Sequence, residues 1–264
     1  MTLYGTSAVT NPDITVAVTL PSALGESPMW HPREQVLYYC DIPGRCVNRY
    51  DPATGELSHW PFDSEVASLA PMLGGGLLLA ARDGLWRFDV ATGKRTALAP
   101  PPYDPRTERF NDGKCDPQGR FWVGTIYEPR DPPNAALYRY ADGKLDKMAD
   151  KITVSNGLAW SPDARTMYWA DTQAHAVYAL DFDVSDGSVS KRRVFAQFPV
   201  KAPDQPLTIY GAAPTAPRSM PKAATGWRCS KALACCASRP TARPRGKSRC
   251  RCAARPCPAS AVQT

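Results

Sequence analysis

The sequence predicts an all-β fold of the propeller type with about four blades, followed by an irregular basic tail. Three observations indicate this fold. Short aliphatic and aromatic segments alternate with turns rich in Pro, Asp and Gly, and no segment has the periodicity of an amphipathic helix. One pattern also recurs four times, with closing aspartates 38, 53 and 41 residues apart. Repetition at this interval is typical of propeller blades rather than of a sandwich.

Each repeated unit has the same order: an opening segment of small residues, a turn, an apolar strand, and a second strand that closes at an Asp and a Gly. An insertion at 128–134 lengthens the third unit, and Trp30, Trp122 and Trp169 are expected in the core between units. The closing aspartates are Asp51, Asp89, Asp142 and Asp183. The expected strands, in pairs by unit, are 36–41 and 47–50, 77–81 and 84–88, 121–125 and 136–140, and 166–171 and 176–182.

Asparagine recurs at one point of the repeat. Asn111-Asp112 opens the third unit and Asn156-Gly157 opens the fourth, each at the start of a strand. Amide and carboxylate oxygens would therefore recur at one height in neighbouring blades, as a site for a hard cation or a sugar requires. Taken singly, these residues are better explained by tight turns, which asparagine favours. Their repetition favours a shared site.

Positive charge and cysteine are concentrated near the C-terminus. Residues 212–264 hold eleven Lys and Arg and no Asp or Glu, so the first 211 residues carry 21 basic against 25 acidic groups. Six of the nine cysteines also lie there, and Cys40, Cys46 and Cys115 have no disulfide-framework spacing. No signal-like segment and no run of about 20 apolar residues occurs. We therefore expect a reduced, cytoplasmic protein that does not enter a membrane.

Four motifs occur in combination: Gly-Glu-Ser-Pro at 25–28, Arg-Phe-Asn-Asp-Gly at 109–113, the segment 116–125, and Ser-Asn-Gly-Leu at 155–158. Together they resemble those of the senescence-marker-protein/gluconolactonase family, which includes regucalcin and bacterial sugar lactonases. The resemblance covers about residues 14–200 and implies a six-bladed propeller with one divalent cation, Ca²⁺, Zn²⁺, Mg²⁺ or Mn²⁺, in its central channel. It also implies hydrolysis of a sugar lactone to the aldonic acid, so the expected partner is a small sugar lactone.

Carried over residue by residue, the resemblance implies that Glu26, Asn156 and Asn111 are metal ligands. It implies Arg109, Asn111 and Glu128 as substrate contacts. A carboxylate with amide oxygens suits a hard cation, which would polarise the lactone carbonyl while a carboxylate takes a proton from water. In the family that carboxylate belongs to a Pro-Asp-Gly motif in the next blade. This chain lacks the motif, so its catalytic residue is unknown.

Strand patterning stops where a fifth blade should begin. One interpretation is a natural disordered basic tail. Another is a change of reading frame between about Asp204 and Ala212, because GC-rich codons chosen for 213–228 and read from the third base restore a Pro-Asp-Gly motif. We therefore divide the chain into a truncated propeller at 1–207 and a non-homologous tail at 208–264. A ring without about two blades would leave open sheet edges, so we expect impaired lactonase activity.

The sequence leaves alternatives to a lactonase open. A propeller that binds calcium or another ligand without catalysis stays open, as does an inactive frameshift product; strictosidine-synthase-like propellers lack the full Arg-Phe-Asn-Asp-Gly motif. No nucleophile elbow or nucleotide-binding motif occurs. The tail is basic but offers only Trp227 for stacking, so no specific nucleic-acid partner is indicated. The sequence leaves the oligomeric state open.

Overall fold

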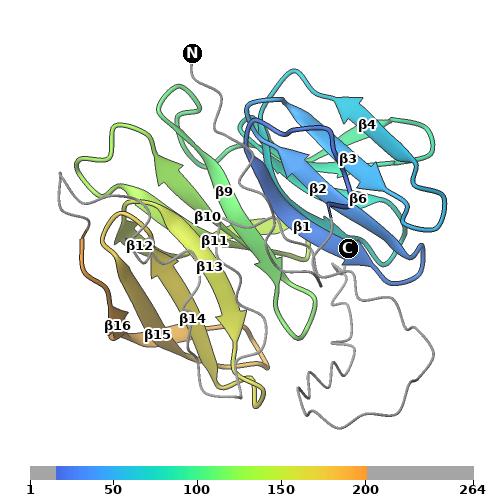
Figure 1. Cartoon of the computed structure of the whole chain (residues 1–264). Coiled ribbons are helices and arrows are strands. Elements are labelled where there is room, and N and C mark those ends of the chain that lie inside the picture. Colours follow the sequence, from blue (N-terminus) through green and yellow to red (C-terminus); the bar gives the residue numbers. More distant parts are fainter. Residues whose placement is uncertain (1–15, 201–264) are drawn as a thin grey trace, which may run out of the picture.

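The computed structural model describes residues 16–200, which fold into sixteen β-strands and no helix (Figure 1). The strands form four antiparallel sheets of four strands, each taken in sequence order. The first sheet is β1 (Gly25–His31), β2 (Val36–Asp41), β3 (Cys46–Tyr50) and β4 (Leu57–Pro61). The second is β5 (Val66–Pro71), β6 (Leu77–Ala81), β7 (Gly84–Phe88) and β8 (Arg95–Ala99). The third is β9 (Glu108–Cys115), β10 (Phe121–Tyr127), β11 (Ala135–Ala141) and β12 (Lys144–Ile152), and the fourth is β13 (Ser155–Trp160), β14 (Thr166–Asp171), β15 (Ala176–Phe182) and β16 (Val189–Gln197).

The predicted all-β propeller type is confirmed. Consecutive sheets pack against one another, and their first strands, β1, β5, β9 and β13, make contacts from sheet to sheet on the inner side of the array (Figure 1). The described residues thus make four blades of the six that the resemblance implies. The predicted tail at 208–264 and the proposed change of frame lie outside the described residues.

Each blade has four strands where the sequence predicted a pair: the opening segment forms a first strand, and a fourth strand follows the Asp-Gly turn. The Asp-Gly segments do not close the blades but connect the third strand to the fourth. In the first blade, Asp51 accepts a hydrogen bond from the backbone N–H of Gly55 (2.8 Å), and its own N–H donates to the carbonyl of Glu56 (2.9 Å). The fourth strands escaped prediction because they are largely exposed: β8 and β16 carry no buried residue and no continuous apolar run.

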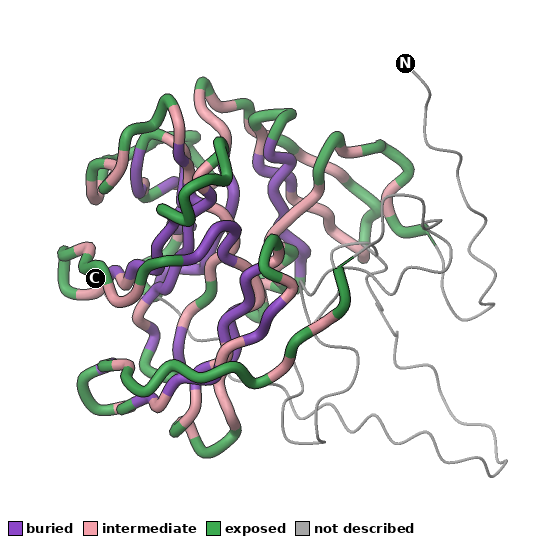
Figure 2. The backbone as a smooth tube through the Cα atoms, turned by 90° about the vertical axis from the view of Figure 1, so that its left-hand side faces the viewer, coloured by how far each residue is buried: buried purple, intermediate pink, exposed green. Residues whose placement is uncertain are grey.

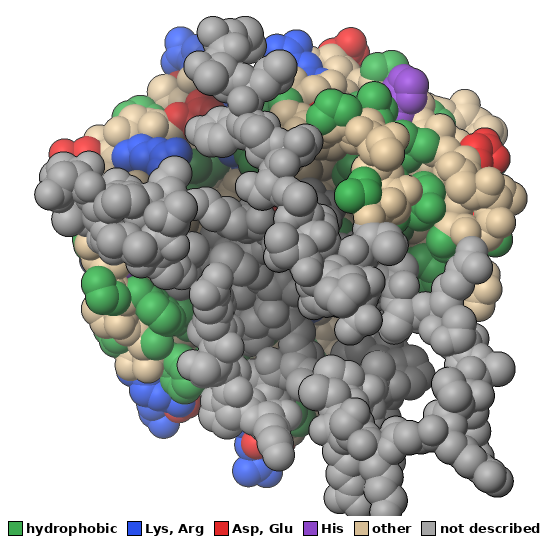
Figure 3. All heavy atoms as spheres, viewed as in Figure 1, with side chains coloured by type: hydrophobic (Ala, Val, Ile, Leu, Met, Phe, Trp, Pro, Cys, Tyr) green, Lys and Arg blue, Asp and Glu red, His purple; other side chains and the backbone are tan. Residues whose placement is uncertain are grey.

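Apolar side chains fill the spaces between neighbouring blades. Trp122 and Trp169 are fully buried in the cluster between the third and fourth blades, where Trp122 also meets Trp160 edge to face at 6.1 Å. Trp30, which was expected in the core, is 50% exposed instead, because it lies at the end of β1. Figure 2 shows the burial concentrated in the strands, with the turns exposed. On the face seen in Figure 3, charged side chains of both signs lie around the rim.

The inner strands share one irregularity of register. Each carries one residue more than the segment of the second strand that pairs with it, which is a β-bulge. A bulge bends the strand and redirects the side chains beside it. The bulged segments are 26–29 in β1, 66–68 in β5, 110–113 in β9 and 156–159 in β13. The motifs that carry the predicted site residues therefore lie at structurally equivalent bulges.

No helix among residues 16–200 is long and apolar enough to cross a membrane. The cytoplasmic location expected from the composition stays a prediction. Residues 16–20 form no strand.

Candidate metal and substrate site

The two repeated asparagines touch each other across the third and fourth blades. The Nδ2 of Asn111 on β9 donates to Oδ1 of Asn156 on β13 (3.2 Å) and to the backbone carbonyl of Ser155 (2.8 Å). The Oδ1 of Asn111 accepts a hydrogen bond from Nη1 of Arg109 (2.9 Å). Three of the residues singled out from the sequence thus form one connected group on adjacent inner strands.

The orientation of each amide separates the roles of the two asparagines. Asn156 donates through Nδ2 to Oγ1 of Thr172 (2.8 Å), so its Oδ1 is directed toward β9. The Oδ1 of Asn111 instead faces the guanidinium of Arg109. A cation needs an oxygen that does not already face a positive charge. The predicted ligand role therefore suits Asn156 better, and the predicted substrate contact suits Asn111 better.

Two carboxylates lie in the same poorly solvated region. Burial raises the pKa of Glu26 on β1 to about 7, and the negative charge of Asp112 adds to that rise, while Arg109 opposes it. Burial likewise raises the pKa of Asp112, whose Oδ2 accepts the backbone N–H of Gly157 (2.7 Å). A nearby cation would stabilise the ionised form of such buried carboxylates, because it offsets their negative charge. The donor set of Glu26, Asp112 and Asn156 therefore fits a hard divalent cation.

Asp112 was not predicted as a site residue, although it belongs to the Arg-Phe-Asn-Asp-Gly motif. In a regular strand neighbouring residues point to opposite faces, so Asn111 and Asp112 could not both face one site. The bulge at 110–113 removes that alternation. The sequence signal that could have identified Asp112 was its carboxylate, which directly follows the candidate ligand Asn111.

The predicted substrate contacts Arg109 and Glu128 also lie together. The Nε of Arg109 is 3.8 Å from Oε1 of Glu128, which follows β10 at the start of the insertion. A second guanidinium, that of Arg82, holds both carboxylate oxygens of Glu128 at 2.7 and 3.1 Å. Its hydrogen bonds are the main reason that the pKa of Glu128 lies below its ordinary value, so this carboxylate is ionised at neutral pH.

The second blade offers no comparable ligand. At the bulge of β5 it presents Ala67 and Ser68, both buried, where the other blades present Glu26, Asn111 and Asn156. Within residues 16–200, no three His, Cys, Asp or Glu side chains group together as metal ligands. A cation held beside Glu26 and Asp112 would need amide oxygens as further ligands.

Comparison with known proteins identifies the family. Residues 24–207 match the family described as SMP-30/Gluconolactonase/LRE-like region. The chain belongs to this family. The chain is 38% identical to the 6-deoxy-6-sulfogluconolactonase of Pseudomonas putida over 189 residues, 71% of this chain and 65% of that protein. It is 36% identical to regucalcin of Xenopus laevis over 176 residues, 64% of this chain and 59% of the relative.

A solved structure of the same SMP-30/gluconolactonase type supports the fold. The protein described as a calcium-binding protein, regucalcin, from Agrobacterium tumefaciens superposes with a TM-score of 0.65 at 29% identity, covering 68% of this chain and 61% of that one. This chain thus spans less than two thirds of the length of the relatives it matches.

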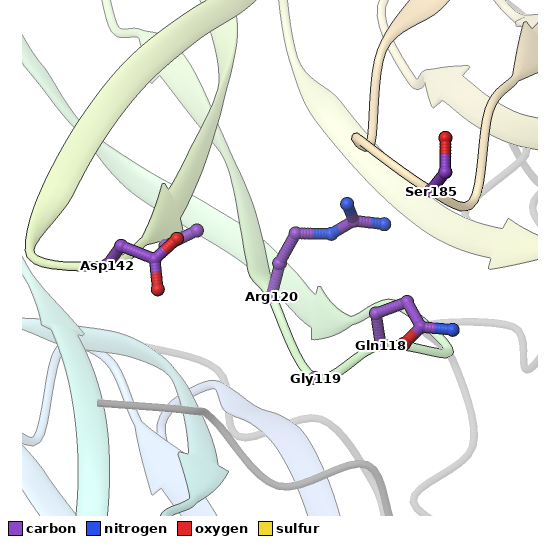
Figure 4. A pocket seen from close by; sticks show the side chains of 6 residues that line it. Gln118, Gly119, Arg120, Asp142 and Ser185 are labelled. Atoms are coloured by element: carbon purple, nitrogen blue, oxygen red, sulfur yellow. The ribbon is translucent and has the colours of Figure 1, made fainter.

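The described part of this SMP-30/gluconolactonase chain also has a polar cavity away from the predicted residues. It has a volume of about 190 Å³ and lies at turns of the third and fourth blades (Figure 4). Arg120 lines it, but the guanidinium is already bound to Asp116 (2.6 Å) and to the carbonyl of Val184 (2.9 Å). This cavity therefore belongs to the packing between two blades. Its lining residues are Gln118, Gly119, Arg120, Ala141, Asp142 and Ser185.

Replacing Thr172 with valine is expected to weaken cation binding about tenfold, because outer partners of a ligand orient it. The change keeps the shape of the side chain but removes the acceptor for Nδ2 of Asn156. Isothermal titration of Ca²⁺ or Mn²⁺ measures the effect. The exposed hydroxyl of Thr92, on a turn of the second blade, gives the matched control, Thr92→Val. Equal affinities for both variants would contradict an orienting role for Thr172.

Proposed function

We propose that this chain carries the site of a metal-dependent sugar lactonase, which hydrolyses a sugar lactone to the aldonic acid with impaired turnover. The observation that supports it best is the meeting of Glu26, Asp112, Asn156 and Arg109 from three inner strands in one poorly solvated region. Family membership and a relative named as a 6-deoxy-6-sulfogluconolactonase point to the same chemistry.

Under this proposal the residues divide into two groups. Glu26 and Asn156 hold a divalent cation, Ca²⁺, Zn²⁺, Mg²⁺ or Mn²⁺, with Asp112 or Asn111 beside them. When bound, such a cation acts as a Lewis acid toward the lactone carbonyl. Arg109 donates hydrogen bonds to sugar oxygens, while the ionised Glu128 and the remaining lone pair of Oδ1 of Asn111 accept them from sugar hydroxyls. The arrangement thus separates the reacting carbonyl from the groups that orient the sugar.

Turnover is proposed to be impaired because proton transfer from water lacks an evident acceptor. The carboxylate that takes this proton in the family belongs to a Pro-Asp-Gly motif that the sequence does not contain. Asp112 is the other carboxylate near Glu26, but its Oδ2 accepts the N–H of Gly157 at 2.7 Å. An acceptor already used in this way is a weaker general base.

A binding propeller without catalysis is the second candidate. The solved Agrobacterium relative is described as a calcium-binding protein, and the residues that fit a cation do not depend on the missing proton acceptor. In that case Ca²⁺ would bind at Glu26 and Asn156, and no lactone would be consumed.

One assay distinguishes the lactonase from the binding propeller. The chain is compared with a version in which residues 208–264 are replaced by the frame-restored sequence, using glucono-1,5-lactone with each of the four cations and with EDTA. We expect slow, cation-dependent hydrolysis by the chain and a much higher kcat for the restored version. Calcium binding with no hydrolysis by either protein would favour the binding propeller. A kcat equal to that of the restored version would contradict the proposed impairment.

A further inference from the structure

We propose that Arg82, between β6 and β7, is a positioning residue that fixes Glu128 beside Arg109 for contact with sugar hydroxyls. This inference rests on the proposed function, because that function assigns the sugar to Glu128 and Arg109. It assigns the second blade a part in the site that its inner strand does not provide.

The guanidinium of Arg82 holds Glu128 by two parallel hydrogen bonds. Its Nη2 donates to Oε1 (2.7 Å) and its Nη1 donates to Oε2 (3.1 Å). This two-point contact fixes the plane of the carboxylate as well as its position, which a single contact cannot do.

Arg82 is itself held from the other side. Its Nε donates to Oε2 of Glu65 (2.7 Å), and its Nη1 also donates to the carbonyl of Pro105 (3.0 Å). The side chain of Arg82 is 22% exposed, so most of it is packed into this network. Because these other partners hold the guanidinium of Arg82 in place, it can determine the orientation of the Glu128 carboxylate.

Glu128 needs such restraint because of its place in the chain. It is the first residue after β10, at the head of the insertion, and its side chain is 41% exposed. Its backbone N–H donates to the carbonyl of Thr107 (2.9 Å), which anchors the main chain but leaves the carboxylate free to rotate. The contact to Arg109 is long, at 3.8 Å. Without Arg82, the carboxylate would have no short bond to hold it near the substrate.

The test uses Arg82→Gln and Arg82→Lys, with Arg106→Gln as matched control. Arg106 also pairs with a carboxylate, Asp104, at 2.7 Å, but its side chain is 86% exposed. Binding of gluconate is measured by calorimetry, KM and kcat are measured with glucono-1,5-lactone, and the pKa of Glu128 is followed by NMR. Thermal denaturation confirms that each variant is folded.

We expect Arg82→Gln to raise the Kd for gluconate and the KM about tenfold while kcat changes less than twofold, because only orientation is lost. The pKa of Glu128 should rise, Arg82→Lys should recover part of the affinity, and the control should match the parent. A lower Tm with unchanged Kd and KM would make Arg82 merely structural and overturn the proposal. If the parent chain binds neither gluconate nor lactone, the proposed function fails and the positioning role falls with it, whatever the variants do.

Discussion

Replacing Glu26 with glutamine is expected to weaken cation binding while stabilising the cation-free fold above neutral pH. The folded-state pKa of Glu26 is about 7, against an ordinary value of 4.5, chiefly because of burial. A raised carboxyl pKa favours folding below pH 4.5, and this contribution is lost as the pH rises through about 7. At pH 8 the buried charge should cost roughly 3 kcal/mol, and glutamine removes that cost. Loss of the carboxylate ligand should reduce cation affinity by more than the 10–100-fold typical of a lost outer partner.

The measurement combines calorimetric titration of Ca²⁺ with thermal denaturation in EDTA. At pH 8 the glutamine variant should melt at a higher temperature than the parent, and at about pH 4 the two should agree, because Glu26 is then protonated in both the folded and the unfolded state. Glu56, on an exposed turn of the first blade, supplies the control Glu56→Gln. Unchanged cation affinity would remove Glu26 from the ligand set, and equal melting at pH 8 would contradict the buried charge.

The strands that the sequence predicted are the apolar runs between turns. The first strands were not predicted as strands, although β5 is completely buried. The second and third strands of each blade, such as β2 and β6, are short apolar runs between turns, and both are completely buried. The fourth strands were missed because an exposed edge needs no apolar pattern, as in β16. A hydrophobic pattern predicts a strand only where its side chains are buried. It gives no signal for an exposed strand that is held by backbone hydrogen bonds alone.

The residues of the candidate site could also be predicted only in part. Repeated motifs predicted that Asn111 and Asn156 would lie at equivalent heights, and the two side chains are in contact. Asp112 escaped because a bulge breaks the alternation of a strand. Arg82 escaped because nothing local connects it to Glu128, 46 residues later in the chain. Local patterns encode local geometry, whereas a long-range ion pair depends on how two blades pack.

The second large effect concerns the contact between the third and fourth blades. Gly124 lies on β10, and a methyl group there would overlap the side chain of Ser155 at the start of β13. Ser155 is fully buried, and its Oγ accepts the indole N–H of Trp169 at 2.7 Å. Its carbonyl accepts Nδ2 of Asn111, and Asn156 is the next residue. Any shift that relieves the overlap therefore moves the candidate site.

Gly124→Ala is expected to cost about 3 kcal/mol, at the upper end for overpacking of a rigid core. For a domain of this size, that corresponds to a loss of roughly 6–12 °C in Tm. Cation affinity should fall in the same variant, because β13 carries Asn156. Gly74→Ala is the matched control, since a Cβ at Gly74 meets no atom within 4 Å.

The double variant Gly124→Ala/Ser155→Gly separates the overlap from other causes. Removing the serine side chain makes room for the methyl group but also removes the acceptor for Trp169, so Tm should recover in large part without reaching the parent value. Recovery of cation affinity in parallel would tie the position of Asn156 to this contact. If Gly124→Ala melts within about 2 °C of the parent, well short of the drop that overpacking predicts, β10 and β13 do not meet as closely as described. That outcome would contradict the proposed coupling between blade packing and the candidate site.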